Sequence, residues 1–393
     1  MGSALPRHHH RRPAVIATAL ALVLMLGACA QERAAGSTPG RATASPSGDT
    51  ESIADFVRRT LPAGPGVTVI AARGDRLAYC GGFGASDRAA GTPASCETVY
   101  DTMSITKQFT AAAIVKLEVM GRLGVNDPIA RHLGDGRPVP EDKRGITIEH
   151  LLTHTSGLPD ALGDDYDPLS RTELIRQAMS SPLQSAPGSE FHYSNIGYGL
   201  LAAIIEEASG QGYEQFLARH LFTPAGMRQT GYVLPRWKEH QVAVEYDSRG
   251  RSQGRPYDHP WAADGPYWNL RGSGGMLSTA HDILQWHRAL LGDEILPAQA
   301  KRKLFHPRVR EPESENSYGY GWSIRDTPHG PLAWHDGGND WSLGLLSRSL
   351  DERILVFWIS NHAYHDGKWN LEDQAAELTL GITDRVRAAN LGK

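Results

Sequence analysis

Strand patterns occur at both ends of this chain, and helical patterns fill the long stretch between them. Near the start, residues 66–71 and 77–79 are typical of two short strands joined by a hairpin turn at Gly74-Asp75. Further strands are expected near the end, at 320–324, 332–334, 342–347 and 354–360. If the strands from both ends of the chain pack around one hydrophobic core, they must belong to a single sheet, with the stretch between them inserted into it. The sequence therefore predicts an α+β fold, with an antiparallel sheet flanked by helices and a mainly helical domain inserted between its halves.

Helical periodicity dominates the insertion, which we place at about 122–312. Its clearest helices are expected at 148–152, 171–179, 196–208, 213–221 and 280–291. Two further helices, at 51–60 and 369–380, lie at the two ends of the folded part and are expected to cover the sheet. The whole folded domain is predicted to span 51–388.

The first fifty residues have the features of an export signal and a tether. Three arginines precede an apolar run at 14–26, which is too short to span a bilayer comfortably. The run ends at Cys29 in a pattern that resembles a bacterial lipobox, so we expect a signal peptide at 1–28 and lipidation of Cys29. Residues 29–50, rich in small residues and proline, then form a flexible tether to the outer face of a bacterial membrane. An ordinary signal peptide that ends near a cysteine is the alternative.

Two other cysteines, Cys80 and Cys96, flank an expected hairpin or loop. Outside the cytoplasm the compartment is oxidising, so we expect them to form a disulfide. Two free buried thiols are the alternative.

Charge and ligand patterns exclude several classes of partner. The net charge is -4 and no basic stripe is present, so a nucleic-acid partner is not expected. His150 and His154 are spaced like a metal pair on a helix, but no Glu follows His150 as in the zinc-protease pattern. We therefore expect structural roles for both histidines, and no metal or other cofactor.

Ser104 and Lys107 form the only Ser-x-x-Lys in the chain. One helical turn separates them, so both side chains point to the same face. A hydroxyl beside a potentially neutral amine is a nucleophile with its own base. The positive end of the helix dipole disfavours the ammonium form of a first-turn lysine. Chance alone supplies about one such tetrapeptide in a chain of this length, so its partners decide its meaning.

The first expected partner of the Ser-x-x-Lys motif is a Tyr-x-Asn motif, and two segments contain one. Tyr193 and Asn195 follow a Pro-Gly turn and directly precede an expected helix, which would present both side chains from a rigid loop. Tyr267 and Asn269 lie in a loop rich in Gly, Pro and Trp, with no regular element beside it. The context favours Tyr193 and Asn195.

Two segments contain His-Asp-Gly. His335 and Gly337 lie at the end of an expected strand, and Gly338 leads into the next strand, which places backbone amides where an oxyanion could be held. His365 and Gly367 lie beyond the last strand. The context favours His335 and Gly337.

Together these motifs resemble the serine beta-lactamase and penicillin-binding protein family, in its class C-like branch. The resemblance extends to the segments 151–159, 187–199 and 272–282, and it covers the chain from Glu51 to the final helix. It implies a beta-lactamase/transpeptidase-like fold. The branch includes DD-peptidases, D-amino-acid amidases and carboxylesterases.

The resemblance also implies roles for the motif residues. Ser104 would be the acylated nucleophile and Lys107 its proton acceptor. Tyr193 would carry protons to the leaving group and from the incoming water, and Asn195 would bind the acyl side of the substrate.

At the third motif the chain departs from the family pattern. His335, with Gly337, would bind substrate where many members have the lysine of Lys-Thr-Gly, and a neutral imidazole attracts a carboxylate less than an ammonium does. The backbone amides of Ser104 and Gly338 would form the oxyanion hole. No class A-type loop for a deacylating water is present, so beta-lactam hydrolysis is expected to be slow.

The expected function is that of an exported serine hydrolase that works through an acyl-enzyme on Ser104. D-alanyl peptides of the cell wall, or related amides, are the expected substrates, as for a DD-carboxypeptidase. A carboxylesterase with the same side chains is one alternative. A penicillin-binding sensor that acylates without turnover is another.

Overall fold

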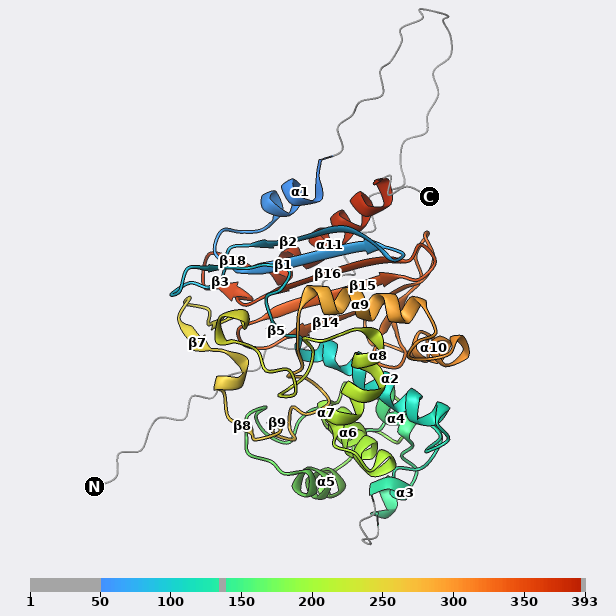
Figure 1. Cartoon of the computed structure of the whole chain (residues 1–393). Coiled ribbons are helices and arrows are strands. Elements are labelled where there is room, and N and C mark those ends of the chain that lie inside the picture. Colours follow the sequence, from blue (N-terminus) through green and yellow to red (C-terminus); the bar gives the residue numbers. More distant parts are fainter. Residues whose placement is uncertain (1–50, 134–138, 390–393) are drawn as a thin grey trace, which may run out of the picture.

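An eight-stranded antiparallel sheet forms the centre of the molecule, and its strands come from both ends of the folded chain (Figure 1). The computed structural model describes residues 51–133 and 139–389, so the predicted signal peptide, Cys29 and tether lie outside the described residues. The strand order is β11-β12-β13-β14-β15-β16-β1-β2. In chain order their bounds are β1 Val67–Arg73, β2 Arg76–Phe83, β11 Val309–Arg310, β12 Ser317–Tyr318, β13 Ser323–Arg325, β14 Leu332–Gly338, β15 Leu343–Ser349 and β16 Ile354–Ser360.

The central strands are apolar along their whole length because both faces of the sheet are covered. Every residue of β16 is buried, and β16 pairs with β1 from the opposite end of the chain. Successive side chains alternate between two cores. The pair Val69 and Trp358 faces the terminal helices, whereas the pair Ile70 and Phe357 faces the larger helical core.

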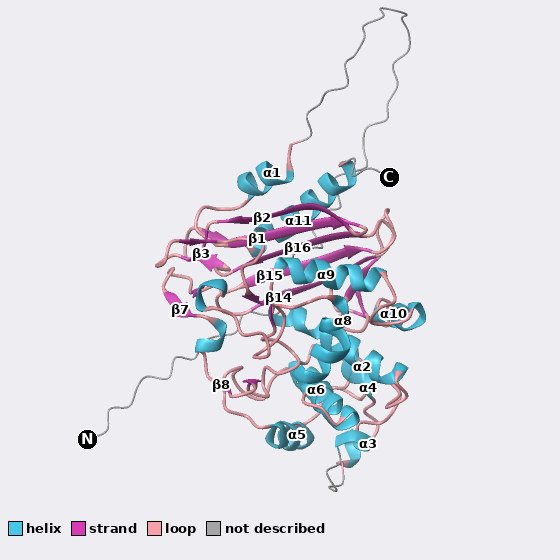
Figure 2. Cartoon of the chain, viewed as in Figure 1, coloured by secondary structure: helices cyan, strands magenta, loops and turns pink. Residues whose placement is uncertain are grey.

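Helices lie on both faces of this sheet (Figure 2). On one face are α1 (Ile53–Thr60) and α11 (Glu372–Ala388), which also contact each other. On the other are α9 (Ala280–Leu291) and the helical region. The remaining helices are α2 Thr106–Val119, α3 Ala130–Leu133, α4 Ile148–Leu152, α5 Arg171–Ser180, α6 Asn195–Ser209, α7 Tyr213–Leu217, α8 Thr223–Ala225 and α10 Ala298–Leu304.

Between β2 and β11, the described strands form only small ladders beside the helices. They pair as β3 Ala85–Asp87 with β4 Thr92–Pro93, β5 Tyr100–Asp101 with β10 Leu277–Ser278, β6 Glu245–Tyr246 with β7 Ser252–Gly254, and β8 Trp261–Ala262 with β9 Gly265–Pro266. A last ladder after β16 joins β17 Tyr364–His365 to β18 Trp369–Asn370.

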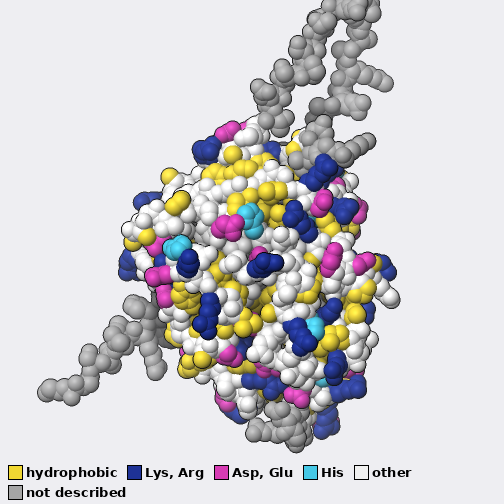
Figure 3. Space-filling model, in the orientation of Figure 1, with side chains coloured by type: hydrophobic (Ala, Val, Ile, Leu, Met, Phe, Trp, Pro, Cys, Tyr) yellow, Lys and Arg dark blue, Asp and Glu magenta, His cyan; other side chains and the backbone are white. Residues whose placement is uncertain are grey.

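The surface of the described part carries charges of both signs. On the face drawn in Figure 3, Lys and Arg side chains lie interspersed with Asp and Glu, and hydrophobic atoms lie between them. Among the described residues, no helix is both long and apolar enough to cross a membrane.

Helix α2 lies at the junction of the two regions, and the candidate nucleophile Ser104 lies in the turn directly before its first residue. Nearly all of its residues are buried. The Phe109 ring meets the edges of Phe222 and Trp286, at centroid distances of 5.2 and 5.0 Å. Such aromatic packing fixes the helix against both neighbours, so the residues at its N-terminus have a rigid base.

Several predicted elements differ from the structure in their bounds; the strand expected at 332–334, for example, continues to Gly338. Three further differences concern the final helix, one helix of the insertion and one strand. The final helix begins at Glu372 rather than 369 and continues past 380 to Ala388, because Gly381 lies in its interior, where a Cβ would meet the Phe56 ring of α1 at 2.1 Å. The helix predicted at 213–221 changes into a π-helical turn after Leu217. The strand predicted at 320–324 begins only at Ser323, because Gly321 has a φ of 74° and turns the chain.

Candidate active site

Ser104 lies in a 3-10 turn, Met103–Ile105, directly before α2, and not inside the helix itself. Met103 has a φ of 49°, which is strained for a residue with a side chain. The carboxylate of Asp101 accepts a hydrogen bond from the Met103 amide at 2.6 Å and so stabilises the turn. Strand β14 packs closely against it: a Cβ on Gly337 would lie 2.7 Å from the Thr102 carbonyl oxygen. Only glycine allows this approach.

Lys107 is fully buried, and its Nζ makes three short contacts. Nζ lies 3.0 Å from Ser104 Oγ, 2.8 Å from Asn195 Oδ1 and 2.8 Å from the Ser273 carbonyl oxygen. Burial lowers the pKa of Lys107 to about 7, although nearby carboxylates oppose this shift. When the amine is neutral, the Ser104 hydroxyl can donate across the 3.0 Å contact. The pair can therefore generate an alkoxide nucleophile near neutral pH.

Tyr193 lies beside this pair. Its hydroxyl is hydrogen-bonded to Ser104, and Lys107 Nζ lies 4.8 Å from the centre of its ring. Burial raises the pKa of Tyr193 well above its usual value, so the phenol is neutral at physiological pH. A neutral phenol at this position can donate a proton to a leaving group that departs from the carbonyl attacked by Ser104.

Asn195 opens helix α6, and its side chain is held from both ends. Its backbone N and its Nδ2 donate to Asp160 Oδ1 at 3.2 and 2.9 Å, while its Oδ1 accepts from Lys107. The amide orientation follows from this network, because only the nitrogen can donate to a carboxylate. Asp160 thus fixes which end of Asn195 faces the lysine.

His335 lies on β14, where the sequence places it, and it is buried. Its Nε2 is 3.0 Å from the Tyr318 hydroxyl, and its Nδ1 is 2.6 Å from the Asp336 carbonyl oxygen. Burial and the nearby Lys107 lower the pKa of His335 to about 3, so the imidazole is neutral. Burial also raises the pKa of the Asp336 carboxyl to about 7. This corner of the site offers no full positive charge to a substrate carboxylate.

A pocket opens beside Ser104, and residues from both regions line it. The lining residues are Asp101, Met103, Ser104, Asp165, Tyr166, Asn195, Leu270, Ser273, Gly274, Gly338 and Asn339. It includes the two residues whose backbone amides were predicted to hold an oxyanion, Ser104 and Gly338. Among the other predicted site residues, Lys107, Tyr193, His335 and Gly337 do not line the pocket, and neither do the residues of the alternative motifs, Tyr267, Asn269, His365 and Gly367.

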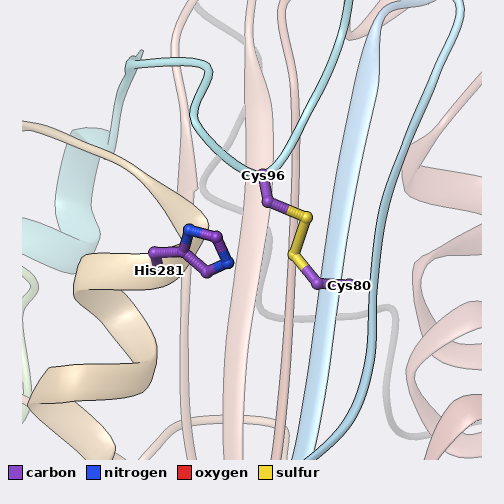
Figure 4. A group of neighbouring side chains, drawn as sticks. All are labelled: Cys80, Cys96 and His281. Atoms are coloured by element: carbon purple, nitrogen blue, oxygen red, sulfur yellow. A yellow bond between two sulfur atoms is a disulfide. The ribbon is translucent and has the colours of Figure 1, made fainter.

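Cys80 and Cys96 form a disulfide, which connects β2 to the loop before the nucleophile turn. His281 lies beside it (Figure 4), and its ring nitrogen and the two sulfurs lie within 4.8 Å of one another. Sulfurs that are bonded to each other are not thiolates, and thiolates are the metal-binding form of cysteine. The His281 Nδ1 pairs with Glu97. This group is therefore a covalent link with a histidine packed beside it.

Four polar groups of the site were not predicted from the sequence. The Ser273 carbonyl binds Lys107, Asp160 binds Asn195, Tyr318 binds His335, and the His154 ring packs on Tyr193. His154 lies beyond the end of α4, with a φ of 58°, and not on the helix that the metal-pair spacing assumed. Each of these four contacts joins residues far apart in the sequence.

Comparisons with known proteins identify the family. Residues 54–380 match the beta-lactamase family. Penicillin-binding protein 4* of Bacillus subtilis strain 168 is 31% identical over 310 residues, which cover 75% of this chain and 67% of that protein. Protein flp of Staphylococcus aureus strain MW2 is 29% identical, over 76% of this chain and 60% of its own.

Two solved structures have the same fold. The octameric penicillin-binding protein homologue from Pyrococcus abyssi has a TM-score of 0.69 and 27% identity, and the match covers 84% of this chain and 76% of that one. The penicillin-binding protein from Bacillus halodurans has a TM-score of 0.70 and 25% identity, over 84% of this chain and 99% of its own. The chain belongs to the beta-lactamase family, and it is a serine hydrolase of the beta-lactamase/transpeptidase superfamily. The predicted family and fold are thereby confirmed.

Proposed function

We propose that this protein hydrolyses amide or ester bonds of small acyl compounds through a covalent acyl-enzyme on Ser104. The observation that carries the proposal is the 3.0 Å contact between Ser104 Oγ and a fully buried lysine amine whose pKa is about 7. A hydroxyl and a half-neutral amine in contact are the two parts that nucleophilic acyl transfer requires.

A residue of the site can be assigned to each step of acylation and deacylation. Lys107 takes the proton of Ser104 as Oγ attacks the substrate carbonyl, and the backbone amides of Ser104 and Gly338 stabilise the oxyanion. Tyr193 gives a proton to the leaving amine or alcohol. Water then attacks the acyl-enzyme, with Tyr193 and Lys107 moving its proton back to Ser104. Asn195, held by Asp160, binds the acyl side of the substrate.

The third motif bears on the choice of substrate. A DD-carboxypeptidase must hold the terminal carboxylate of its peptide, and the residue in the position for that task, His335, is neutral and buried. The arrangement therefore supports amides and esters without a free carboxylate beside the scissile bond better than it supports D-alanyl-D-alanine peptides. Those peptides, and slow beta-lactam hydrolysis, are secondary candidates.

The test uses the purified full chain. It is incubated separately with a beta-lactam, a D-Ala-D-Ala peptide and a short-chain ester, while intact mass and product are followed over time. Turnover with a transient adduct that Ser104→Ala abolishes supports the proposal and identifies the bond class. A permanent adduct without product indicates the penicillin-binding sensor instead. Turnover that persists in Ser104→Ala contradicts the assignment of the nucleophile.

We further propose that the protein is exported and anchored by lipid at Cys29. The apolar run at 14–26 and the lipobox-like sequence that ends at Cys29 support this proposal. Cells that express the full chain would be labelled with an alkyne analogue of palmitate. Labelling that the Cys29→Ala variant loses is the expected result, and unlabelled wild-type protein in the culture medium would contradict it.

A further inference from the structure

We propose that the pocket beside Ser104 selects substrates that carry a cationic group, such as a free ammonium, and discriminates against those that carry a carboxylate. This inference rests on the proposed acyl transfer at Ser104. It concerns the part of the substrate that lies next to the bond being cleaved, and it names the chemical class that the pocket accepts.

The first support is the set of charged side chains that line the pocket. Both are acidic: Asp101 and Asp165. Neither lysine nor arginine is among the lining residues in the described part of the chain. Lys107 lies directly behind the wall, and its amine already has three acceptors, Ser104, Asn195 and Ser273, so its hydrogen-bonding capacity is in use. A substrate carboxylate in this pocket would find no cation to pair with, and removing it from water would be unfavourable.

The second support is the aromatic surface beside these carboxylates. Tyr166 lines the pocket, and its ring lies 4.7 Å from that of His259 and 6.0 Å from that of Trp341. The His259 and Trp341 rings stack at 4.3 Å, so the tyrosine belongs to a packed group and has a fixed position. A rigid aromatic ring next to a carboxylate is a typical binding surface for an ammonium group.

The surrounding charges act in the same direction. Burial raises the pKa of Tyr166, and four nearby carboxylates raise it further: Glu245, Asp101, Asp165 and Asp340. Burial also raises the pKa of Asp101, and Glu245 adds to the shift. The environment of the pocket thus disfavours negative charge even on its own side chains. A bound ammonium would relieve this repulsion, whereas a bound carboxylate would increase it.

The experiment compares three p-nitroanilides that share the scissile bond and differ in the group on the alanine nitrogen: D-alanine (ammonium), N-acetyl-D-alanine (neutral amide) and N-succinyl-D-alanine (amide with a carboxylate). We expect kcat/KM to fall in that order, by about tenfold or more for each step, as expected for unit charges a few ångströms apart in a partly buried pocket. Asp165→Asn should reduce the ratio between the first two substrates severalfold. Asp75→Asn is the matched control, because Asp75 lies in the turn between β1 and β2, at the end of the sheet away from Gly338.

Each outcome decides the question. Equal rates for the three substrates, or faster cleavage of the succinyl compound, would overturn the inference while leaving the acyl-enzyme proposal intact. If Asp165→Asn leaves the ratio of kcat/KM between the first two substrates unchanged, the charge of Asp165 does not determine substrate selection. If no compound is cleaved or forms an adduct that depends on Ser104, both proposals fail together.

A separate observation concerns His154, and we infer that it is a positioning residue for Tyr193. His154 is fully buried, and it is hydrogen-bonded to the residues on both sides of Tyr193. Its carbonyl oxygen accepts from the His192 amide at 2.7 Å, and its Nδ1 accepts from the Ser194 amide at 3.0 Å.

These contacts divide between the backbone and the side chain of His154. The bond to His192 joins two backbone groups, whereas the bond to Ser194 depends on the imidazole. The His154 ring also lies 4.3 Å from the Tyr193 ring, at an interplanar angle of 32°. Both the backbone and the imidazole ring of His154 therefore restrain the position of Tyr193.

Two variants test this role. His154→Ala removes the ring and the Nδ1 acceptor, whereas His154→Asn keeps an acceptor and tolerates the φ of 58°. We expect His154→Ala to lower kcat at least about tenfold with KM nearly unchanged, as for a displaced catalytic group. His154→Asn should recover part of the lost kcat. Wild-type kcat in both variants would overturn the inference. So would a loss of activity that follows only the loss of folded protein, without rescue by Asn.

Discussion

Gly337→Ala is the substitution that most directly tests how β14 and the nucleophile turn fit together. A Cβ at this position would lie 2.7 Å from the Thr102 carbonyl oxygen, 3.0 Å from Met103 Cβ and 3.1 Å from the Ser104 backbone nitrogen. Two of these three atoms belong to the backbone and cannot rotate away. Ordinary contact would require the strand and the turn to separate by roughly half an ångström.

The expected cost has two parts. Overpacking of this kind typically destabilises the fold by about 1–3 kcal/mol. The effect on catalysis should be larger, because the displaced nitrogen is the Ser104 amide that would bind the oxyanion, and a misplacement of about 1 Å can lower a rate roughly 100-fold. We therefore expect the acylation rate to fall between about 10-fold and 100-fold, while the protein still folds at about 25 °C.

The assay is the pre-steady-state rate of acylation by a chromogenic ester, measured together with the melting temperature. Gly344→Ala is the matched control: Gly344 is the partner of Gly337 on β15, but the three atoms nearest to its added Cβ belong to Ile359 and Trp358, and none belongs to the nucleophile turn. It should lower the melting temperature and leave acylation nearly unchanged. An acylation rate in Gly337→Ala within twofold of the wild type would refute the reasoning.

Three further predictions address the site and its support. Lys107 must be neutral to accept a proton and its pKa is about 7, so the acylation rate should rise about tenfold per pH unit below pH 7 and level off above it. Asp160→Ala frees the amide of Asn195 and should lower kcat/KM roughly tenfold in steady-state assays; it should also move the inflection of the pH profile to lower pH, because Asp160 raises the pKa of Lys107. Replacing Cys80 and Cys96 by serine opens a loop with a sequence separation of 16 and should reduce the free energy of unfolding by about 3 kcal/mol in denaturant titrations, with activity retained at about 25 °C.

These three predictions can each fail independently. A pH profile that is flat from weakly acidic to weakly alkaline conditions would contradict a lysine base. An Asp160→Ala variant with wild-type kcat/KM would show that Asn195 keeps its orientation without the carboxylate. A serine double variant as stable as the wild type would show that the disulfide does not restrain the unfolded chain.

The parts of the site that depend on local sequence could be predicted. Ser104 and Lys107 come together because they are one turn apart, and Asn195 follows because it starts a helix whose cap is visible in the sequence. Asp160 could not be found in this way, because its contact with Asn195 spans 35 residues and needs the folded helical region. The Ser273 carbonyl has no signature at all, since every residue has a carbonyl group.

The fold shows the same division. Continuous apolar runs such as β16 predicted central strands, because burial on both faces selects such residues. The two-residue strands β11 and β12 are too short to produce a pattern; β12 is defined by its pairing with β13, and β11 by its pairing with β12. Gly381 is typical of a helix end in the sequence, yet it lies inside α11, since the ring of Phe56 occupies the space where a side chain would be. The need for glycine at position 381 thus depends on a contact between α1 and α11, at the two ends of the domain.

The pairing of β1 with β16 also affects the order in which the protein can be made. Strand β1 leaves the ribosome early, but one of its two neighbours in the sheet, Ile354–Ser360, is among the last segments synthesised. Such long-range pairing raises the contact order and delays completion of the sheet. Gly337 and Gly338 also lie late in the chain, so a nascent chain or a truncated product that ends before them contains Ser104 without the strand that packs against it. Hydrolytic activity should therefore appear only after nearly the whole chain has been translated and folded.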